Sequence, residues 1–304
     1  MARLSSSKIV IYAALSGNLL IAVTKFAAAG WTGSSAMLSE GVHSLVDTGN
    51  QALMLYGIHR SMLPPDADHP LGYGRELYFW SFIVALLIFA LGAGISIYEG
   101  VVHIQNPSAI TDSTVNYVVL GLSFVFESAT WFVAWREFSK QKGSLGVLDA
   151  VIRSRDPTTF LVLFEDSAAL LGILIAFAGT LAAQLLEAPI FDGVASIGIG
   201  LVLAATALFL ARESKGLLIG EPARREIVRS ISEIAKSNDN VSGVDRLVTV
   251  HLAPNQIVVA LDVEFMDNML TTQVEEAAAK LESSIKSAHP DVIALFLHPK
   301  KIHL

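Results

Sequence analysis

The sequence predicts an all-α bundle of six membrane-spanning helices followed by a small cytoplasmic α+β domain. Of the 304 residues, 53% are hydrophobic and only 16% are charged, and the mean hydropathy is +0.55. Soluble domains carry about 25% charged residues, so this composition indicates a membrane protein. After about residue 213 the composition becomes that of a soluble domain. Two domains are therefore expected, over residues 1–212 and 213–304.

The helix count follows from the length of the apolar segments. A helix needs roughly 20 apolar residues to cross a bilayer. Six segments qualify, at about residues 8–29, 36–58, 78–101, 114–135, 158–183 and 189–211. The first segment resembles a signal peptide at its Ala-Ala-Ala-Gly end, but it contains Lys25 and five more spans follow it. We therefore interpret it as a retained helix.

The orientation follows from the basic residues. The linkers after the first, third and fifth segments contain no Lys or Arg. The opposite side carries Arg3, Lys8, Arg60, Arg75, Arg136, Lys140, Lys142, Arg153, Arg155, Arg212 and Lys215. Because basic residues accumulate on the cytoplasmic side, both termini are expected to be cytoplasmic. The sequence has no Arg-rich amphipathic presequence, which favours a bacterial inner membrane over an organelle.

Composition also restricts the chemistry. The chain has no cysteine, so disulfides and thiolate ligands are excluded and a bound transition metal would need imidazole and carboxylate ligands. The net charge is −7. A nucleic acid is therefore not expected as a partner, because binding its backbone requires a basic surface.

The second segment places polar residues in an apolar setting. Glu40, His43, Ser44 and Asp47 are spaced at i, i+3, i+4 and i+7, which places them on one stripe of a helix. His43 and Asp47 could offer a nitrogen and an oxygen to the same divalent ion. Such an ion would offset the cost of a buried carboxylate. The alternative is that His43 only donates an interhelical hydrogen bond.

The fourth and fifth segments add further acids. Glu165 and Asp166 are adjacent, so they lie about 100° apart on a helix and only one can point along the centre of a face. We favour Asp166 as the ligand. Glu127 falls at the middle of the fourth segment, where it could be a ligand, a proton carrier or the ion-pair partner of Lys25.

The C-terminal region alternates helical and strand patterns. Residues 223–236 and 271–288 have apolar residues at helical spacing, whereas residues 244–252, 256–265 and 292–299 are typical of strands. The order helix, strand, strand, helix, strand predicts a small domain of ferredoxin-like, metallochaperone-like type. Its sheet would keep one face or edge available for a second copy, so a homodimer is expected.

These features together resemble the cation diffusion facilitator family. The resemblance rests on the HSLVD motif at residues 43–47, the DADHPLGYGRE loop at residues 66–76, the six helices and the C-terminal domain. It implies a metal-transport site built from the second and fifth spans. The family pattern places His or Asp four residues before Asp166, where this chain has Val162, so Glu165 or water would complete the site. The adjacent acids and Glu127 are similar to the mitochondrial-type zinc transporters.

The resemblance also implies two accessory sites. In the loop, Asp66 and His69 match positions that can bind a second ion, although Tyr73 replaces a histidine; the alternative is a structural turn. In the C-terminal domain, Asp262 and His298 match positions of a regulatory metal site, with His251 and Asp245 near them in sequence. The alternative there is a dimerisation domain without metal, which we favour.

The function expected from the sequence is secondary active transport. A divalent transition metal, with Zn²⁺ preferred and Mn²⁺, Fe²⁺ or Co²⁺ possible, would leave the cytosol in exchange for protons by alternating access. The partners are then metal ions, protons, lipid and a second copy, with no organic cofactor. The alternatives are a membrane-embedded metal-dependent enzyme, for which no HExxH, GxSxG or P-loop motif is present, and a metal-gated channel or sensor.

Overall fold

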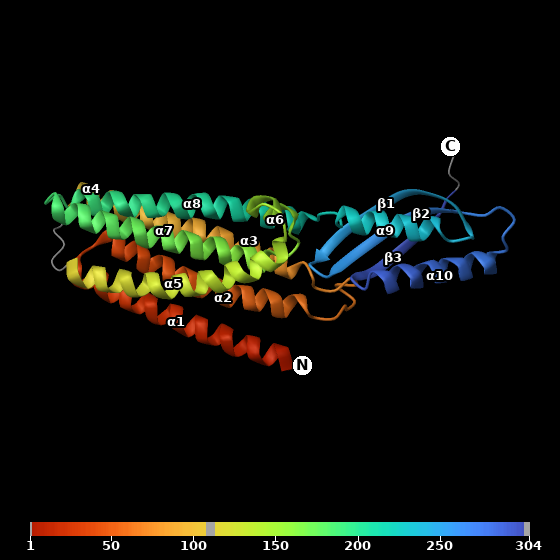
Figure 1. Cartoon of the computed structure of the whole chain (residues 1–304), viewed down its shortest axis with the longest axis horizontal. Coiled ribbons are helices and arrows are strands. Elements are labelled where there is room, and N and C mark those ends of the chain that lie inside the picture. Colours follow the sequence, from red (N-terminus) through yellow and green to blue (C-terminus); the bar gives the residue numbers. More distant parts are fainter. Residues whose placement is uncertain (1, 108–112, 301–304) are drawn as a thin grey trace. The chain divides into compact units, whose positions relative to one another are not determined.

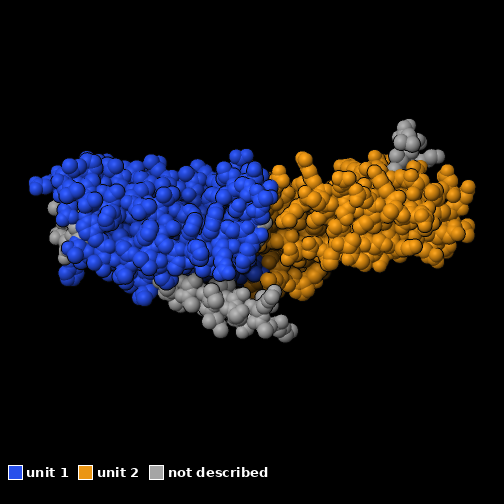
Figure 2. Space-filling model, in the orientation of Figure 1, with its two compact units in different colours: residues 1–58, 79–152, 157–214 blue, residues 59–78, 153–156, 215–304 orange. Residues whose placement is uncertain are grey.

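The computed structural model describes residues 2–107 and 113–300 and divides into two compact units (Figure 2). The side chains of Arg3 and Lys8, used above for the orientation, lie outside the described residues. One unit contains the long helices up to Ser214. The other contains the chain from Lys215 onward together with two connecting stretches, His59–Tyr78 and Arg153–Asp156.

Long helices coincide with all six apolar segments (Figure 1). They are α1 (Ala2–Thr32), α2 (Ser35–Ser61), the continuous run α3 (Glu76–Leu87), η1 (Ile88–Ala93) and α4 (Gly94–Gln105), α5 (Ser113–Lys142), α7 (Pro157–Leu185) and α8 (Ile190–Ile219). A short helix, α6 (Val147–Arg153), precedes α7. Gly33 ends α1 with φ 73°, a left-handed conformation that glycine adopts without strain. Pro157 occupies the first position of α7, where its missing N–H costs no hydrogen bond.

Four of these helices are long and apolar enough to cross a membrane, judged on the described residues. They are Glu76–Gln105, Thr114–Lys140, Pro157–Leu185 and Ile190–Ile219. The helices α1 and α2 are not among them. Polar residues such as Glu40 and Asp47 lower the hydropathy of α2, and part of α1 has no described side chains. The count of six membrane spans therefore stays a prediction.

Glycine contacts bring α4 very close to α8. A Cβ atom added at Gly100 would lie 2.6 Å from the carbonyl oxygen of Gly193, and one added at Gly193 would lie 2.9 Å from the carbonyl oxygen of Gly100. Gly200 repeats this arrangement two turns further along, with the backbone of Ala93 and Ile97 at 3.0 Å. Small residues that let two backbones touch are a common basis for helix association in membranes.

Replacing Gly100 with alanine is expected to destabilise the protein by about 1–3 kcal/mol, because the new methyl group would push the backbone of α8 away. The matched control is Gly121→Ala in α5, where an added Cβ meets nothing within 4 Å. Thermal unfolding of both variants in detergent would measure the difference. Equal unfolding midpoints would contradict this view of the α4 and α8 contact.

The C-terminal domain has the predicted α+β organisation. Strands β1 (Val241–Ala253) and β2 (Gln256–Phe265) are antiparallel, and β3 (Val292–Pro299) runs parallel to β2, giving the order β1-β2-β3. Helices α9 (Arg225–Lys236) and α10 (Thr271–Ala288) supply the apolar side chains that cover the sheet. Their shared core is formed by Ile231, Ala235, Ile257, Val259, Leu261, Val263, Leu281 and Ile285.

Candidate metal centre

The polar stripe of α2 is buried, as the spacing of its residues predicts. Glu40, His43, Ser44 and Asp47 are all buried, and Asn50 continues the stripe at the next turn. His43 Nδ1 lies 3.3 Å from Asp47 Oδ1. Three atoms form no hydrogen bond within the described residues: the two ring nitrogens of His43 and the Oδ1 atom of Asp47. Buried polar atoms normally find a partner, so these three atoms are suited to an ion.

The second half of the centre comes from α7. Glu165 and Asp166 are both buried. Their adjacent positions in the sequence did not reveal whether one or both would be. Glu165 accepts a hydrogen bond of 2.6 Å from the Asn50 amide and lies within hydrogen-bonding reach of Asp47. The Oδ2 atom of Asp166 has no hydrogen-bond partner in the described part of the chain. Two helices that are over one hundred residues apart in sequence thus meet through their acids.

Glu127 of α5 faces the same region. It is buried, and it lies near both Asp47 and Asp166. In the arrangement described, however, no three His, Asp or Glu side chains stand close enough together to hold a metal ion. Binding an ion between α2 and α7 would therefore require the side chains of His43, Asp47 and Asp166 to turn toward one another.

Lys25 of α1 is paired with Glu40. Its Nζ atom lies 3.0 Å from Glu40 Oε2 and donates to the Ser44 hydroxyl at 2.9 Å, and both charged side chains are 0% exposed. The sequence offered Glu127 as the partner of Lys25, whereas the structure pairs Lys25 with Glu40. The other oxygen of Glu40 is directed at Gly172 of α7, where an added Cβ would lie 2.3 Å away. Glycine at position 172 thus makes room for the buried carboxylate.

Sequence reasoning missed Asn50. It lies at i+3 from Asp47 and i+7 from His43, so the same periodicity that identified the stripe includes it. An amide within an apolar segment is a weaker signal than a charge, because it carries a smaller cost of burial. In the contacts described above, Asn50 is the residue of α2 that donates a hydrogen bond to an acid of α7, Glu165.

The loop between α2 and α3 favours the turn interpretation of Asp66 and His69. Asp66 Oδ1 accepts hydrogen bonds from the backbone N–H groups of Asp68 and His69 at 3.1 and 2.7 Å. The Tyr73 hydroxyl donates to Oδ2 at 2.6 Å, and this hydrogen bond is the main reason that the pKa of Asp66 is lowered. The His69 ring stacks on Tyr73 at 4.1 Å. Both carboxylate oxygens of Asp66 therefore accept hydrogen bonds that stabilise the turn.

The C-terminal domain brings together three of the four predicted residues. Asp262 and His298 are register partners across β2 and β3, with His298 Nδ1 3.3 Å from Asp262 Oδ1. Lys300, which sequence reasoning missed, lies between Asp245 at 3.3 Å and Asp262 at 3.7 Å. Because an ammonium group already lies between the two acids and pairs with both, the geometry favours a domain without metal at this position.

His251 stays apart from that group. It pairs with Ile257, five residues before Asp262 on β2, and its Nδ1 atom lies 3.1 Å from the Ala253 carbonyl oxygen. Burial lowers the pKa of His251. The structure therefore assigns His251 to the packing of the sheet end rather than to the acids at Asp262.

Two family models match the chain. The model described as cation efflux transmembrane domain matches residues 11–219, and the one described as cation efflux protein, cytoplasmic domain, matches residues 223–301. The first covers the helices that carry the candidate centre, and the second covers the α+β domain. Together they account for the resemblance that the HSLVD motif and the loop had indicated.

Curated relatives agree with these matches. The human proton-coupled zinc antiporter SLC30A9, mitochondrial, is 33% identical over 264 residues, which are 86% of this chain and 46% of the relative. Metal tolerance protein C4 of Arabidopsis thaliana is 37% identical over 244 residues, 79% of this chain and 52% of the relative. The manganese efflux system protein MneP of Bacillus subtilis is 24% identical over 298 residues, 96% of this chain and 95% of the relative.

The chain spans about half the length of the human and plant relatives. Its family is nevertheless fixed by the transmembrane match, which covers more than half of this chain. The predicted alternative of a membrane-embedded enzyme is excluded, because members of this family are transporters. The chain belongs to the cation efflux family, also called the cation diffusion facilitators.

Proposed function

We propose that this transporter moves zinc out of the cytosol in exchange for protons, at a centre formed by His43, Asp47, Glu165 and Asp166. The observation that carries the proposal is the burial of unpartnered ligand atoms of α2 and α7 on facing helices, within the described residues. One imidazole and several carboxylates form a ligand set that suits Zn²⁺. The name of the human relative, a zinc antiporter, agrees with this choice.

The proposed centre has more oxygen than nitrogen ligands, which is also compatible with harder metal ions. Replacing an imidazole with a carboxylate favours Mn²⁺ or Fe²⁺ relative to a site richer in histidine. The Bacillus relative is named for manganese. Transport of Zn²⁺ in competition with Mn²⁺, Fe²⁺ and Co²⁺ would therefore rank the ions directly, with Zn²⁺ expected to compete most strongly.

The side chains proposed as metal ligands can also bind protons. Asp47 and Glu165 lie within hydrogen-bonding reach of each other, and two carboxyl groups can share a hydrogen bond only if one of them holds a proton. A metal ion needs the same atoms deprotonated, so the two cargoes compete for one set of side chains. Alternating exposure of this set to the two sides of the membrane converts that competition into exchange.

The proposal includes a membrane arrangement. With 31 and 27 residues, α1 and α2 are long enough to span, and burial of Lys25 against Glu40 removes their most costly charges from lipid. Six spans would then place both termini in the cytoplasm. We further propose a homodimer joined through the C-terminal domain, in a bacterial plasma membrane.

Proteoliposomes with an imposed pH gradient test the exchange. Uptake of Zn²⁺ into vesicles with an acidic interior is expected to be accompanied by alkalinisation of the lumen, recorded with a trapped pH dye. Collapsing the gradient with a protonophore should slow uptake about tenfold or more. Vesicles containing the Asp47→Ala variant serve as the control. Metal uptake that ignores the gradient would instead identify a channel.

A further inference from the structure

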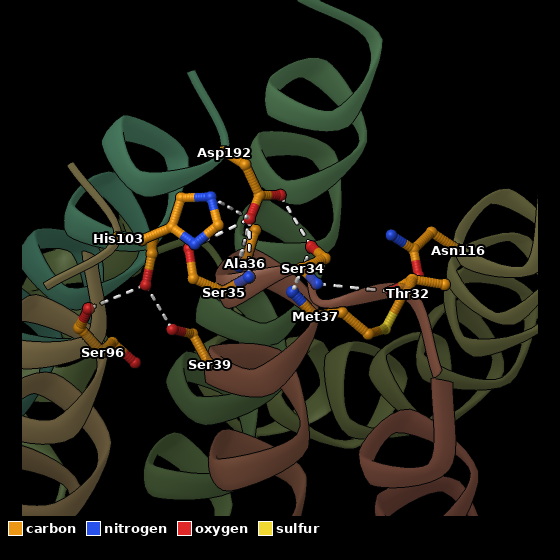
Figure 3. A network of polar contacts seen from close by, with 11 residues as sticks. Thr32, Ser34, Ser35, Ala36, Met37, Ser39, Ser96, His103, Asn116 and Asp192 are labelled. Atoms are coloured by element: carbon orange, nitrogen blue, oxygen red, sulfur yellow. Dashed lines mark hydrogen bonds and ion pairs between the residues drawn. The ribbon is translucent and has the colours of Figure 1, made fainter. Parts of the chain in front are cut away.

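A second buried cluster lies at the end of the helix bundle where α1 joins α2 and α7 joins α8. Its centre is Asp192, in the first turn of α8 (Figure 3). Asp192 Oδ1 accepts a hydrogen bond of 2.7 Å from the Ser34 hydroxyl. Its Oδ2 atom accepts from the backbone N–H groups of Ser35 and Ala36 at 2.6 and 3.2 Å and from the Ser35 hydroxyl at 3.0 Å. We call these four residues the Asp192 cluster.

The Asp192 cluster is a helix cap supplied by another helix. The first N–H groups of a helix have no partner within it, and a negative charge at this end is favourable. Caps of this kind normally come from the residue that precedes the helix, whereas Asp192 lies 157 residues after Ser35. The carboxylate therefore ties the start of α2 to α8. His103 of α4, the one titratable side chain paired with Asp192 in the described residues, lies 3.9 Å from Oδ2.

The contact between α2 and its neighbours stays polar one turn further into the bundle. The hydroxyl groups of Ser39 and Ser196 share a hydrogen bond, and Ser196 also donates to the Ser96 carbonyl oxygen at 2.8 Å. At this end, α2 is thus joined to α8 through hydroxyl, backbone N–H and carboxylate groups.

The other contacts of α8 are of a different kind. Gly193 and Gly100 interlock α8 with α4, and a Cβ atom at Gly179 of α7 would lie only 2.2 Å from the Cβ atom of Ala195. Separating interlocked backbones loses close packing with no compensating interaction. Polar groups that separate can instead form hydrogen bonds to water, which recovers most of the lost interaction once water enters. Of these contacts, the one between α2 and α8 is therefore the one whose groups water can satisfy after the helices part.

We propose that Asp192 is a positioning residue for transport, which closes this end of the bundle while it holds α2 and opens it when α2 is released. The proposal rests on the proposed function. His43 and Asp47 lie eight and twelve residues after Ser35 on the same helix, so a displacement of the helix start moves the ligands with it. The linkers at this end contain no Lys or Arg, which places the opening on the side where the ion is released.

A reversible cross-link tests whether the contact opens in each cycle. The chain has no cysteine, so Ser39→Cys and Ser196→Cys would create the one possible intramolecular disulfide. The hydrogen-bonded hydroxyls indicate a Cβ separation close to the roughly 3.5–4.5 Å that a disulfide needs. Oxidation of the double variant in proteoliposomes is expected to reduce Zn²⁺ transport more than tenfold, and reduction should restore it. Each single variant, oxidised in the same way, is the control.

Two results would overturn the proposal: wild-type transport by the double variant after its disulfide has been confirmed by mass spectrometry, or failure of the disulfide to form. If the double variant does not fold, Asp192→Ala replaces it, with an expected tenfold slower transport and a Zn²⁺ dissociation constant within twofold of the wild type. Asp192→Asn keeps one acceptor oxygen and should recover part of the rate. An unchanged rate for Asp192→Ala would equally exclude the role of Asp192.

The failure of the proposed function would look different. If the unmodified protein moves no metal under any pH gradient, the exchange is wrong, whatever the cross-link does. If the unmodified and reduced proteins transport metal and the oxidised protein does so equally fast, the exchange stands and the role of Asp192 is wrong.

Discussion

Replacing Asp47 with alanine is expected to abolish metal transport and to weaken binding of Zn²⁺ in the membrane domain by at least about 100-fold. Asp47 lies 3.3 Å from His43 one turn away on α2 and within hydrogen-bonding reach of Glu165 on α7. Loss of residues that merely support metal ligands already costs about 10–100-fold in affinity, and loss of a ligand should cost at least the upper value, about 3 kcal/mol. Asp166→Ala should behave in the same way.

Equilibrium binding of Zn²⁺ to the purified protein and uptake into proteoliposomes are the two measurements. Asp149→Ala, at an exposed position in the short helix α6, removes an acid of the same type away from the centre and is expected to leave both unchanged. All three variants should elute as the wild type does in size-exclusion chromatography. Normal transport by both Asp47→Ala and Asp166→Ala would show that the centre lies elsewhere.

Replacing Lys25 with methionine is expected to destabilise the protein by about 3–5 kcal/mol, because it leaves the carboxylate of Glu40 buried without its counter-charge. Methionine has a similar length, so the loss would reflect charge rather than a cavity. The second substitution Glu40→Gln should recover most of the stability in the double variant, since a neutral amide next to a neutral thioether carries a much smaller burial cost.

The same experiment distinguishes Glu40, the partner of Lys25 in the structure, from Glu127, the partner expected from the sequence. If Lys25 pairs with Glu40, then Lys25→Met is rescued by Glu40→Gln and not by Glu127→Gln. Thermal unfolding midpoints of the single and double variants in detergent provide the comparison. Rescue by Glu127→Gln alone would contradict the arrangement described for α1 and α2.

The residues of the candidate centre could be proposed from the sequence because their signals are local. His43 and Asp47 are one turn apart on the same helix, and an acid within an apolar segment is conspicuous wherever it occurs, as at Glu127, Glu165 and Asp166. The α+β order of the C-terminal domain follows from alternating patterns of the same kind. Periodicity within one segment is sufficient for these conclusions.

The remaining features depend on how helices and strands are placed against one another. Whether Lys25 faces Glu40 or Glu127 depends on the rotation of α1 about its own axis. Packing against neighbouring helices sets this rotation, and the apolar pattern of the segment does not reveal it. Asp192 stands at the start of its segment, where an acid usually caps its own helix, and only the folded chain brings it to Ser35. Lys300 reaches Asp245 across the sheet for the same reason.

The division into two compact units has a practical consequence. The chain passes from one unit to the other after Ile58, Tyr78, Ile152, Asp156 and Ser214, so the second unit is assembled from three separate stretches. Arg155 forms an ion pair with Glu221 and donates to the Pro222 carbonyl oxygen, while the Tyr78 hydroxyl donates to the carbonyl oxygen of Arg155. A fragment beginning near residue 213 would lose Arg155 and Tyr78 and leave Glu221 without its counter-charge. The C-terminal unit is therefore not an independent fragment, and measurements of metal or partner binding belong on the intact chain.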